Sequence, residues 1–469
     1  MRIRYTCILL MLVFIHLIFG QVPEKWTKMM GSAYTENHSY FFLQRVCDEA
    51  GGRLVGTPEN EKALNILEEE LKQLGITPIQ EPFSLPVWVR GDDRIEITSP
   101  INRQIKAVAL GYSPTTPSFT ADVVDGGLGY AEIFDSMNVQ NKIVLISEGK
   151  RGGKPVPLRY QIIDMAAKNG AKAVLFVNNK AGNMVRAGTS NFQGKPAAVP
   201  AFSITFEEGE RIKRLLGRSI QVSMKIEVNS KNKPGTSSNV IVRFPGKTKK
   251  KIVLGAHFDS WDLGQGAIDN GIGSAILFDV ARLMKQFSPN NYYTIELVWF
   301  NGEELGLWGS KAYMETHRDD DILLMMNMDM TGLVYGFDIM GFLEGKDYFT
   351  ALANKMASME ISNDIAEYPW TNSDHMPFMF QGIPCLTFRA TLDTEMSRYY
   401  HAMGDTFDKV KKQYLSHSAG IIAIVTHQLA NEKKFPFRKY SPEEVKHMME
   451  KFGIDKRLKQ QGEWPFSEN

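Results

Sequence analysis

The residues with the clearest capacity for chemistry are histidines and carboxylates that lie far apart in the sequence. Five candidate metal ligands are His257, Asp269, Asp329, His401 and one member of the Glu303–Glu304 pair. Imidazole and carboxylate groups in this proportion suit zinc, which takes nitrogen and oxygen donors at about 2.0–2.2 Å. Five ligands exceed what one tetrahedral ion needs, and they fit two ions that share a carboxylate. Such a pair of ions activates water and stabilises a developing oxyanion. The pattern therefore predicts a metallohydrolase with two zinc ions per chain.

The neighbours of each candidate suggest its role. Asp259, two residues after His257, is placed to hold the other nitrogen of that imidazole ring and so fix its tautomer. Asp269 lies in a Gly-Ala-Ile-Asp-Asn-Gly turn that opens a helix, where an acid can serve as a simple N-cap. We favour the role of bridging ligand for Asp269. Asp329 follows an apolar strand, a position that is hard to explain for a surface acid.

The adjacent glutamates Glu303 and Glu304 are costly side by side unless a cation or a proton compensates their charge. The economical division is that one coordinates metal while its neighbour accepts the proton of the attacking water. The residue types alone leave open which glutamate takes which role.

Apolar runs position these candidates. Segments 252–256, 293–300 and 322–328 read as short buried strands that end beside His257, the glutamate pair and Asp329. Segments 270–287 and 413–431 read as helices. Near-continuous apolar strands separated by helices predict an α/β fold, with a mostly parallel sheet covered by helices on both faces. Ligands in such sheets gather beyond the carboxyl ends of the strands, where these candidates fall.

The remaining segments divide the chain. Residues 39–75 read as two helices, the second capped by Thr57, and 108–225 contain a strand, helix and strand without any candidate ligand, which we interpret as an inserted domain. Residues 231–238 read as a turn-rich exit from it. The predicted parts are a signal peptide (1–20), the N-terminal part of the catalytic domain (21–107), the insertion (108–225), the main catalytic part (226–435) and a tail (436–469). The tail carries a capping box at 441–444, and we expect no chemistry there.

The start of the chain and its composition bound location and partners. Arg2 and Arg4 precede an apolar stretch at 7–19 that is too short to span a bilayer and is typical of a signal peptide. We therefore expect a soluble glycoprotein of the secretory or extracellular space, with a sequon at Asn37, that needs no membrane after signal cleavage. The net charge of +1 gives no reason to propose a nucleic acid partner. Whether Cys47 and Cys385 pair is not readable from the sequence, and no arginine cluster is apparent that would commit a pocket to acidic side chains.

The string from His257 to Asp269, His-x-Asp-Ser-Trp-Asp-x-Gly-Gln-Gly-Ala-x-Asp, resembles the metal motif of the co-catalytic zinc aminopeptidase and carboxypeptidase family. The similarity runs from about residue 25 to 431 and includes an insertion that resembles a protease-associated domain. The resemblance implies His257 and Asp329 on one zinc ion and Glu304 and His401 on the other, with Asp269 bridging them. It also implies Glu303 as the general base and Tyr400 as the group that stabilises the tetrahedral intermediate.

The same resemblance implies hydrolysis of dipeptides and short peptides with free termini by a secreted or lysosomal homodimer, activated by loss of an N-terminal propeptide. Three alternatives remain: an aminopeptidase of the same family, a non-catalytic receptor on the same scaffold, and a single-zinc glutaminyl cyclase of related fold. The complete ligand set speaks against the receptor, and the inserted domain speaks against the cyclase.

Overall fold

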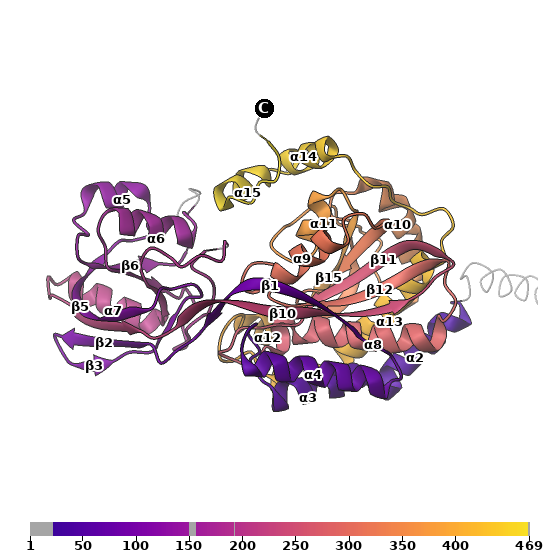
Figure 1. Ribbon diagram of the computed structural model, residues 1–469, viewed down its shortest axis with the longest axis horizontal. Helices are drawn as coiled ribbons and strands as arrows, with labels where there is room; N and C mark the ends of the chain where they lie inside the picture. Colours follow the sequence, from indigo (N-terminus) through magenta and orange to yellow (C-terminus); the bar gives the residue numbers. More distant parts are fainter. Residues whose placement is uncertain (1–21, 150–155, 192, 468–469) are drawn as a thin grey trace, which may run out of the picture.

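The computed structural model describes residues 22–149, 156–191 and 193–467, which form two domains, each built around its own sheet (Figure 1). The predicted signal peptide lies outside the described residues. Among the helices of the described part, none combines the length and the apolar character needed to cross a membrane.

The main domain has a seven-stranded sheet in the order β1-β10-β12-β11-β13-β15-β14. Its four central strands are parallel: β12 (Tyr293–Phe300), β11 (Thr248–His257), β13 (Ile322–Asn327) and β15 (Cys385–Thr391). The antiparallel strands β1 (Ile79–Val89), β10 (Lys231–Phe244) and β14 (Leu333–Asp338) flank them. Because the central strands are buried on both faces, they read as the continuous apolar runs from which a mostly parallel sheet was predicted. That prediction is confirmed.

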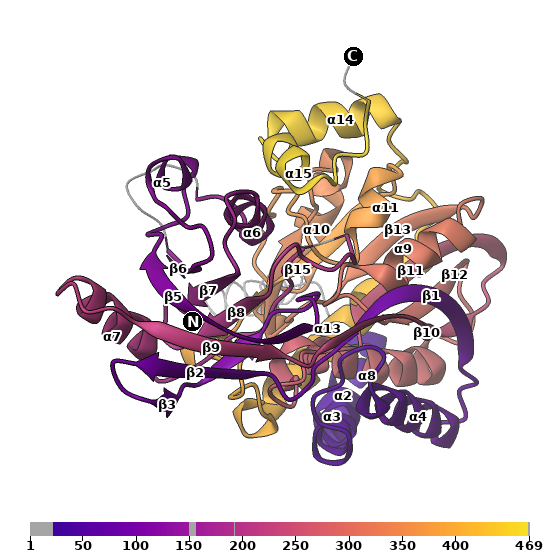
Figure 2. The same cartoon turned by 60° about the vertical axis from the view of Figure 1, so that its left-hand side comes forward.

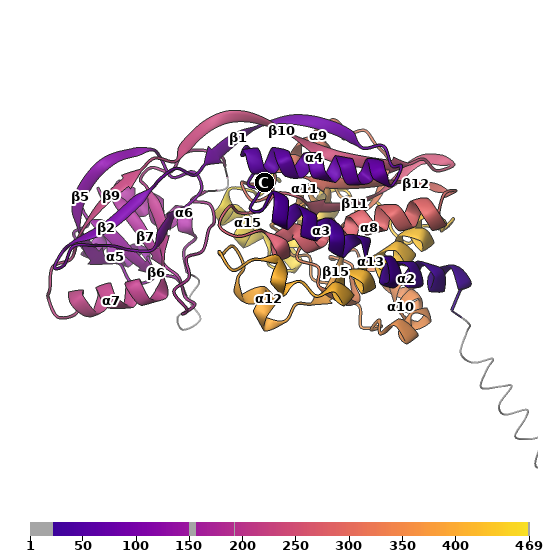
Figure 3. The same ribbon diagram turned by 90° about the horizontal axis from the view of Figure 1, so that it is seen from below.

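Helices cover both faces of this sheet (Figures 1 and 3). One layer holds α2 (Glu24–Glu36), α3 (His38–Glu49), α4 (Pro58–Gln73), α8 (Ile272–Phe287) and α13 (Lys412–Ala430), and the other α9 (Trp308–Thr316), α10 (Lys346–Lys355) and α11 (Met376–Phe380). Thr57 caps α4 as predicted, since its side chain accepts the amide of Asn60. The sequence prediction missed α2. The turn between α2 and α3 holds the half-buried sequon residue Asn37.

The inserted domain has an eight-stranded sheet in the order β3-β2-β9-β5-β6-β7-β8-β4. Its strands are β2 (Arg94–Ser99), β3 (Arg103–Gln104), β4 (Ala107–Ala109), β5 (Thr116–Asp125), β6 (Ile143–Ser147), β7 (Ala173–Val177), β8 (Ala201–Ile204) and β9 (Ser223–Val228), with helices α5 (Ala131–Ser136), α6 (Arg159–Lys168) and α7 (Phe206–Leu216). Its sheet extends beyond the predicted range of 108–225 at both ends, because β2 and β3 pair with β9.

A long antiparallel ribbon joins the two domains. Residues 231–238, predicted to be a turn-rich exit, instead form the first half of β10, which pairs with β1 along all of Ile79–Val89. Pro86 lies directly opposite Pro234, so the two residues without an amide donor share one position of the ladder. The turn prediction was wrong because proline and glycine are tolerated in a two-stranded ribbon at the sheet edge. Figures 1 and 2 show the ribbon running between the domains.

The C-terminal tail contains α14 (Pro442–Lys451) and α15 (Asp455–Gln461). The predicted capping box is confirmed, because Ser441 accepts the amide of Glu444 and Glu444 accepts the amide of Ser441. Cys47 and Cys385 are both buried free thiols and do not pair with each other. The remaining short elements are α12 (Thr394–Arg398), the π-turn η1 (Ala267–Gly271) and the 3₁₀ turns η2 (Leu343–Gly345), η3 (Ala357–Met359) and η4 (Phe407–Lys409).

Candidate metal centre

The carboxyl ends of the parallel strands deliver most of the predicted ligands to one place. His257 is the last residue of β11, Glu303 and Glu304 follow β12, and Asp329 follows β13. Asp269 lies in η1 at the start of α8, and His401 follows α12 with a left-handed backbone (φ 57°). A left-handed non-glycine residue costs free energy, so the surrounding contacts must hold this loop in place.

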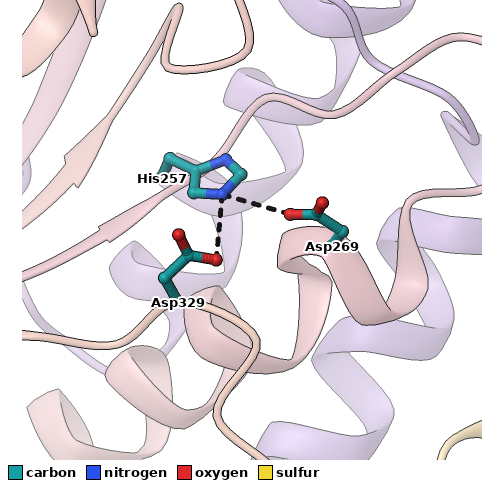
Figure 4. A group of neighbouring side chains, drawn as sticks. All are labelled: His257, Asp269 and Asp329. Atoms are coloured by element: carbon teal, nitrogen blue, oxygen red, sulfur yellow. Dashed lines mark ion pairs between the residues drawn. The ribbon is translucent and has the colours of Figure 1, made fainter. Parts of the chain in front are cut away.

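The five predicted ligands form two groups that share Asp269. In the first group, the Nε2 atom of His257 lies 3.3 Å from Asp269 Oδ1 and 3.5 Å from Asp329 Oδ1 (Figure 4). In the second, the Nε2 atom of His401 lies 3.0 Å from Asp269 Oδ2 and 3.1 Å from Glu304 Oε2. Each oxygen of Asp269 therefore belongs to a different group, which is the arrangement of a bridging carboxylate.

These separations suit zinc. Two ligands of a tetrahedral zinc ion at about 2.1 Å lie about 3.4 Å apart. The donor pairs, at 3.0 to 3.5 Å, are close to that value. Glu304 Oε1 is also buried and has no hydrogen-bond partner among the described residues. The residues present therefore fit two zinc ions that share Asp269.

The pKa values of the site also indicate that it binds a cation. Burial raises the pKa of Glu304 to about 7, although His401 opposes this. Burial likewise holds the pKa of Glu303 well above its ordinary value. Burial alone would lower the pKa of His401, but Glu304 and Asp269 raise it to about 9. Without a metal ion, protons on the glutamates and on His401 offset the negative charge of the clustered carboxylates. A bound cation would offset that charge in their place.

We therefore expect zinc affinity to fall as the pH is lowered from about 9 to about 6. Below pH about 9 the imidazole of His401 is protonated, so zinc must displace a proton from it. Below pH about 7 the carboxyl group of Glu304 is protonated as well, so zinc must displace a second proton. Competitive zinc titration of the metal-free protein across this pH range, in buffers of different ionisation enthalpy, measures both affinity and proton release. An affinity that does not change across the range would contradict this electrostatic account.

The position of Asp259 differs from the expectation. Its carboxylate lies 3.7 Å from Nδ1 of His257, too far for a hydrogen bond, and the main-chain oxygen of Asp259 is the closer partner at 3.1 Å. The carboxylate instead accepts the backbone amides of Glu303 and Glu304 at 3.1 and 3.2 Å. Asp259 thus fixes the glutamate pair relative to the His257 loop.

Two supports of the site were not assigned from the sequence. Arg53, fully buried, donates to the carbonyls of Phe258, Gln265 and Gly266 and so holds the loop between His257 and Asp269. Asp405 accepts the amides of Ile268 and Asp269 at 2.7 and 3.0 Å. Its place four residues after His401 was the available signal, whereas nothing in the sequence singled out Arg53.

A cavity of about 360 Å³ opens beside these ligands. Glu303, Glu304, His401 and Tyr400 border it, and the ring of Tyr400 stacks on that of His401 at 3.7 Å between centroids. Three arginines also border the cavity: Arg159 and Arg186 from the inserted domain and Arg457 from the tail. Residue types and spacing did not indicate this group, because its members lie on three segments far apart in the chain.

Asp374 and His375 are buried next to the centre but belong to neither ligand group. Burial raises the pKa of Asp374 to about 7, and both of its oxygens lack a hydrogen-bond partner within the described part of the chain. Burial lowers the pKa of His375 to about 4, so this imidazole is neutral at pH 7. Neither residue had been predicted to coordinate metal.

Comparisons with known proteins agree with this geometry. Residues 239–426 match peptidase family M28, and residues 116–212 match the PA domain. Carboxypeptidase Q of Xenopus laevis is 27% identical over 414 residues, which cover 84% of this chain and 86% of that protein. Aminopeptidase YwaD of Bacillus subtilis (strain 168) is 26% identical over 418 residues, with coverages of 86% and 87%.

The crystal structure of a peptidase M28 precursor from Shewanella amazonensis SB2B shares the fold, with a TM-score of 0.77 and 24% identity over 89% of this chain and 98% of that one. The M28 match contains all five candidate ligands, and the PA match lies within the inserted domain. Residues 239–426 of the chain therefore resemble peptidase family M28, and the structure gives the chain two candidate zinc sites and an inserted domain that matches the PA domain.

Proposed function

We propose that this protein is a di-zinc exopeptidase that hydrolyses dipeptides and short peptides with free termini, with a specificity like that of carboxypeptidase Q. The observation that carries the proposal is the placement of Asp269, with one oxygen in each ligand group. Glu303 and two of the ligands, Glu304 and His401, border the adjoining small cavity. A volume of about 360 Å³ is near the lower end of the roughly 300–1,000 Å³ of small-molecule pockets. A cavity of that size favours short peptides over folded proteins.

The zinc ions, when bound, supply Lewis acidity toward the scissile carbonyl and toward water. Glu303 is the proposed general base, which accepts a proton of the attacking water on its carboxylate and passes it to the leaving amine. Asp259 accepts its backbone amide, and Glu303 borders the same cavity as the ligands Glu304 and His401.

Tyr400 is the proposed donor to the oxyanion of the tetrahedral intermediate. Its side chain borders the cavity and its ring is held against His401. Desolvation is the largest cause that holds the pKa of the phenol well above its ordinary value, and the negative charges of Asp269 and Glu304 add to it. The hydroxyl therefore keeps its proton and remains a donor.

We also propose that the chain is secreted or lysosomal after removal of residues 1–20, and that it acts as a homodimer. The basic residues and the short apolar stretch of the N-terminus support the first proposal. An aminopeptidase activity is the second candidate, because the relatives include an aminopeptidase.

The test is a panel of dipeptides and tripeptides with free or blocked ends, incubated with the purified mature chain after chelation and after zinc reconstitution. We expect hydrolysis that requires zinc and a free carboxyl end. Release of amino acids from the amino end of peptides with an amidated carboxyl end would favour the aminopeptidase. Absence of zinc-dependent hydrolysis from the whole panel would favour a binding protein.

A further inference from the structure

The C-terminal tail forms one wall of the catalytic cavity. Figure 1 shows α15 between α6 of the PA domain and α9 of the peptidase domain, and Arg457 and Glu463 of the tail both border the cavity. The tail is anchored by Leu458, which is fully buried, and by Gln461, whose side-chain amide donates to Asn372 at 3.3 Å. These contacts fix the position of α15 relative to the peptidase domain.

The cavity wall formed by the PA domain carries more positive charge than its carboxylate compensates. Arg159 donates to Glu148 Oε1 at 2.8 Å, while Arg186 reaches the other oxygen of Glu148 only at 3.7 Å. Nε of Arg186 is buried without a hydrogen-bond partner among the described residues. One carboxylate is therefore shared by two guanidinium groups.

On the tail side, the carboxylate of Glu463 is paired with a lysine rather than with Arg457. Glu463 lies 3.6 Å from Nζ of Lys311, and Lys311 also donates to the carbonyl of Gly306 at 2.9 Å. Arg457 is exposed to the cavity and forms no ion pair with any residue that the structure describes. Of the three arginines that border the cavity, Arg159 and Arg186 face Glu148. Arg457 forms no ion pair within the described residues and acts on the charge of Glu463 only from a longer distance.

We propose that Arg457 binds the free terminal carboxylate of the substrate peptide and is a specificity-determining residue. A guanidinium group matches a carboxylate with two parallel hydrogen bonds, and such charge-assisted pairs are stronger than neutral ones. Arg186 adds positive charge on the facing wall. The acidic groups Glu303 and Glu304 lie at the metal end, so the carboxylate of the peptide is directed away from them and toward the arginines.

This inference rests on the proposed function, since it names how that site recognises one end of a peptide. The carboxyl end of a dipeptide lies within about 4 Å of its scissile carbonyl carbon, given standard bond lengths. Because Arg457 borders the same small cavity as Glu303 and His401, the proposal applies to dipeptides and very short peptides. Amidation of the carboxyl end removes the charge that Arg457 would bind.

The test measures dipeptide binding by calorimetry to the zinc-loaded full chain carrying Glu303→Gln, which stops turnover. The probes are Ala-Ala, Ala-Ala amide and Ala-Glu amide. Adding Arg457→Gln should weaken Ala-Ala about tenfold and leave Ala-Ala amide unchanged. Arg457→Lys should weaken the binding of Ala-Ala less than Arg457→Gln does, because lysine keeps the positive charge but lacks the two parallel N–H donors of the guanidinium group. The control is Lys456→Gln, which alters a neighbouring exposed cation outside the cavity wall. It should change the affinity for neither Ala-Ala nor Ala-Ala amide.

Equal weakening of Ala-Ala and its amide by Arg457→Gln would overturn the inference and indicate a structural role. Unchanged binding of Ala-Ala would overturn it as well. A loss confined to Ala-Glu amide would overturn the assignment to the terminal carboxylate and point to an acidic side chain. Because these are binding measurements on a non-hydrolysing variant, they give an answer even if the hydrolysis panel shows no peptidase activity.

Discussion

The Glu303→Gln variant should lose about 10²–10⁴-fold in kcat while it retains two zinc ions. The amide keeps the shape of the side chain but cannot accept the proton of the attacking water. Glu303 belongs to neither ligand group, so its replacement removes no metal ligand. Elemental analysis of the purified variant and its kcat on a dipeptide substrate give the two measurements.

The matched control is Glu304→Gln, because Glu304 lies in the same loop but belongs to the second ligand group with His401 at 3.1 Å. This variant should lose zinc together with activity. If Glu303→Gln stripped the metal and Glu304→Gln did not, the roles of the two glutamates would be exchanged. If Glu303→Gln kept full activity, another group would have to serve as the base.

Much of the main domain was predictable because burial constrains both which residues a segment contains and where the segment lies in the fold. A strand buried on both faces must be apolar along its length, so β12 and β13 could be located to within a residue. Parallel strands place their carboxyl ends at one edge, which is why residues as distant as His257 and Asp329 could be expected to meet. The helix α8 followed from its apolar positions.

The features that the sequence did not reveal depend on contacts between distant segments. Arg53 supports the metal loop by donating to three backbone carbonyls, and backbone acceptors leave no trace in residue types. The first half of β10 contains Pro-Gly-Thr-Ser, a local turn signal that pairing with β1 overrides. Arg457 lies in a tail from which no chemistry was expected, and only the fold brings it to the cavity.

Asp269→Asn should weaken both zinc sites and reduce kcat by about 10³-fold or more, since the ions supply several kcal/mol of transition-state stabilisation. Its two oxygens face His257 and His401 separately, at 3.3 and 3.0 Å. The asparagine keeps one oxygen and presents an amide nitrogen, with no lone pair for metal, to the other site. Chelator competition and elemental analysis measure the number and affinity of the bound ions, and circular dichroism checks the fold.

The comparison that gives this experiment its meaning is Asp329→Asn, because Asp329 belongs only to the group of His257. That variant should weaken one zinc site and leave the other close to its original affinity. The two single changes have the same chemistry and similar size, and they differ in how many ligand groups contain the altered carboxylate. Two tightly bound ions in Asp269→Asn would show that the aspartate does not bridge, and equal losses in both variants would show that the sites fill only together.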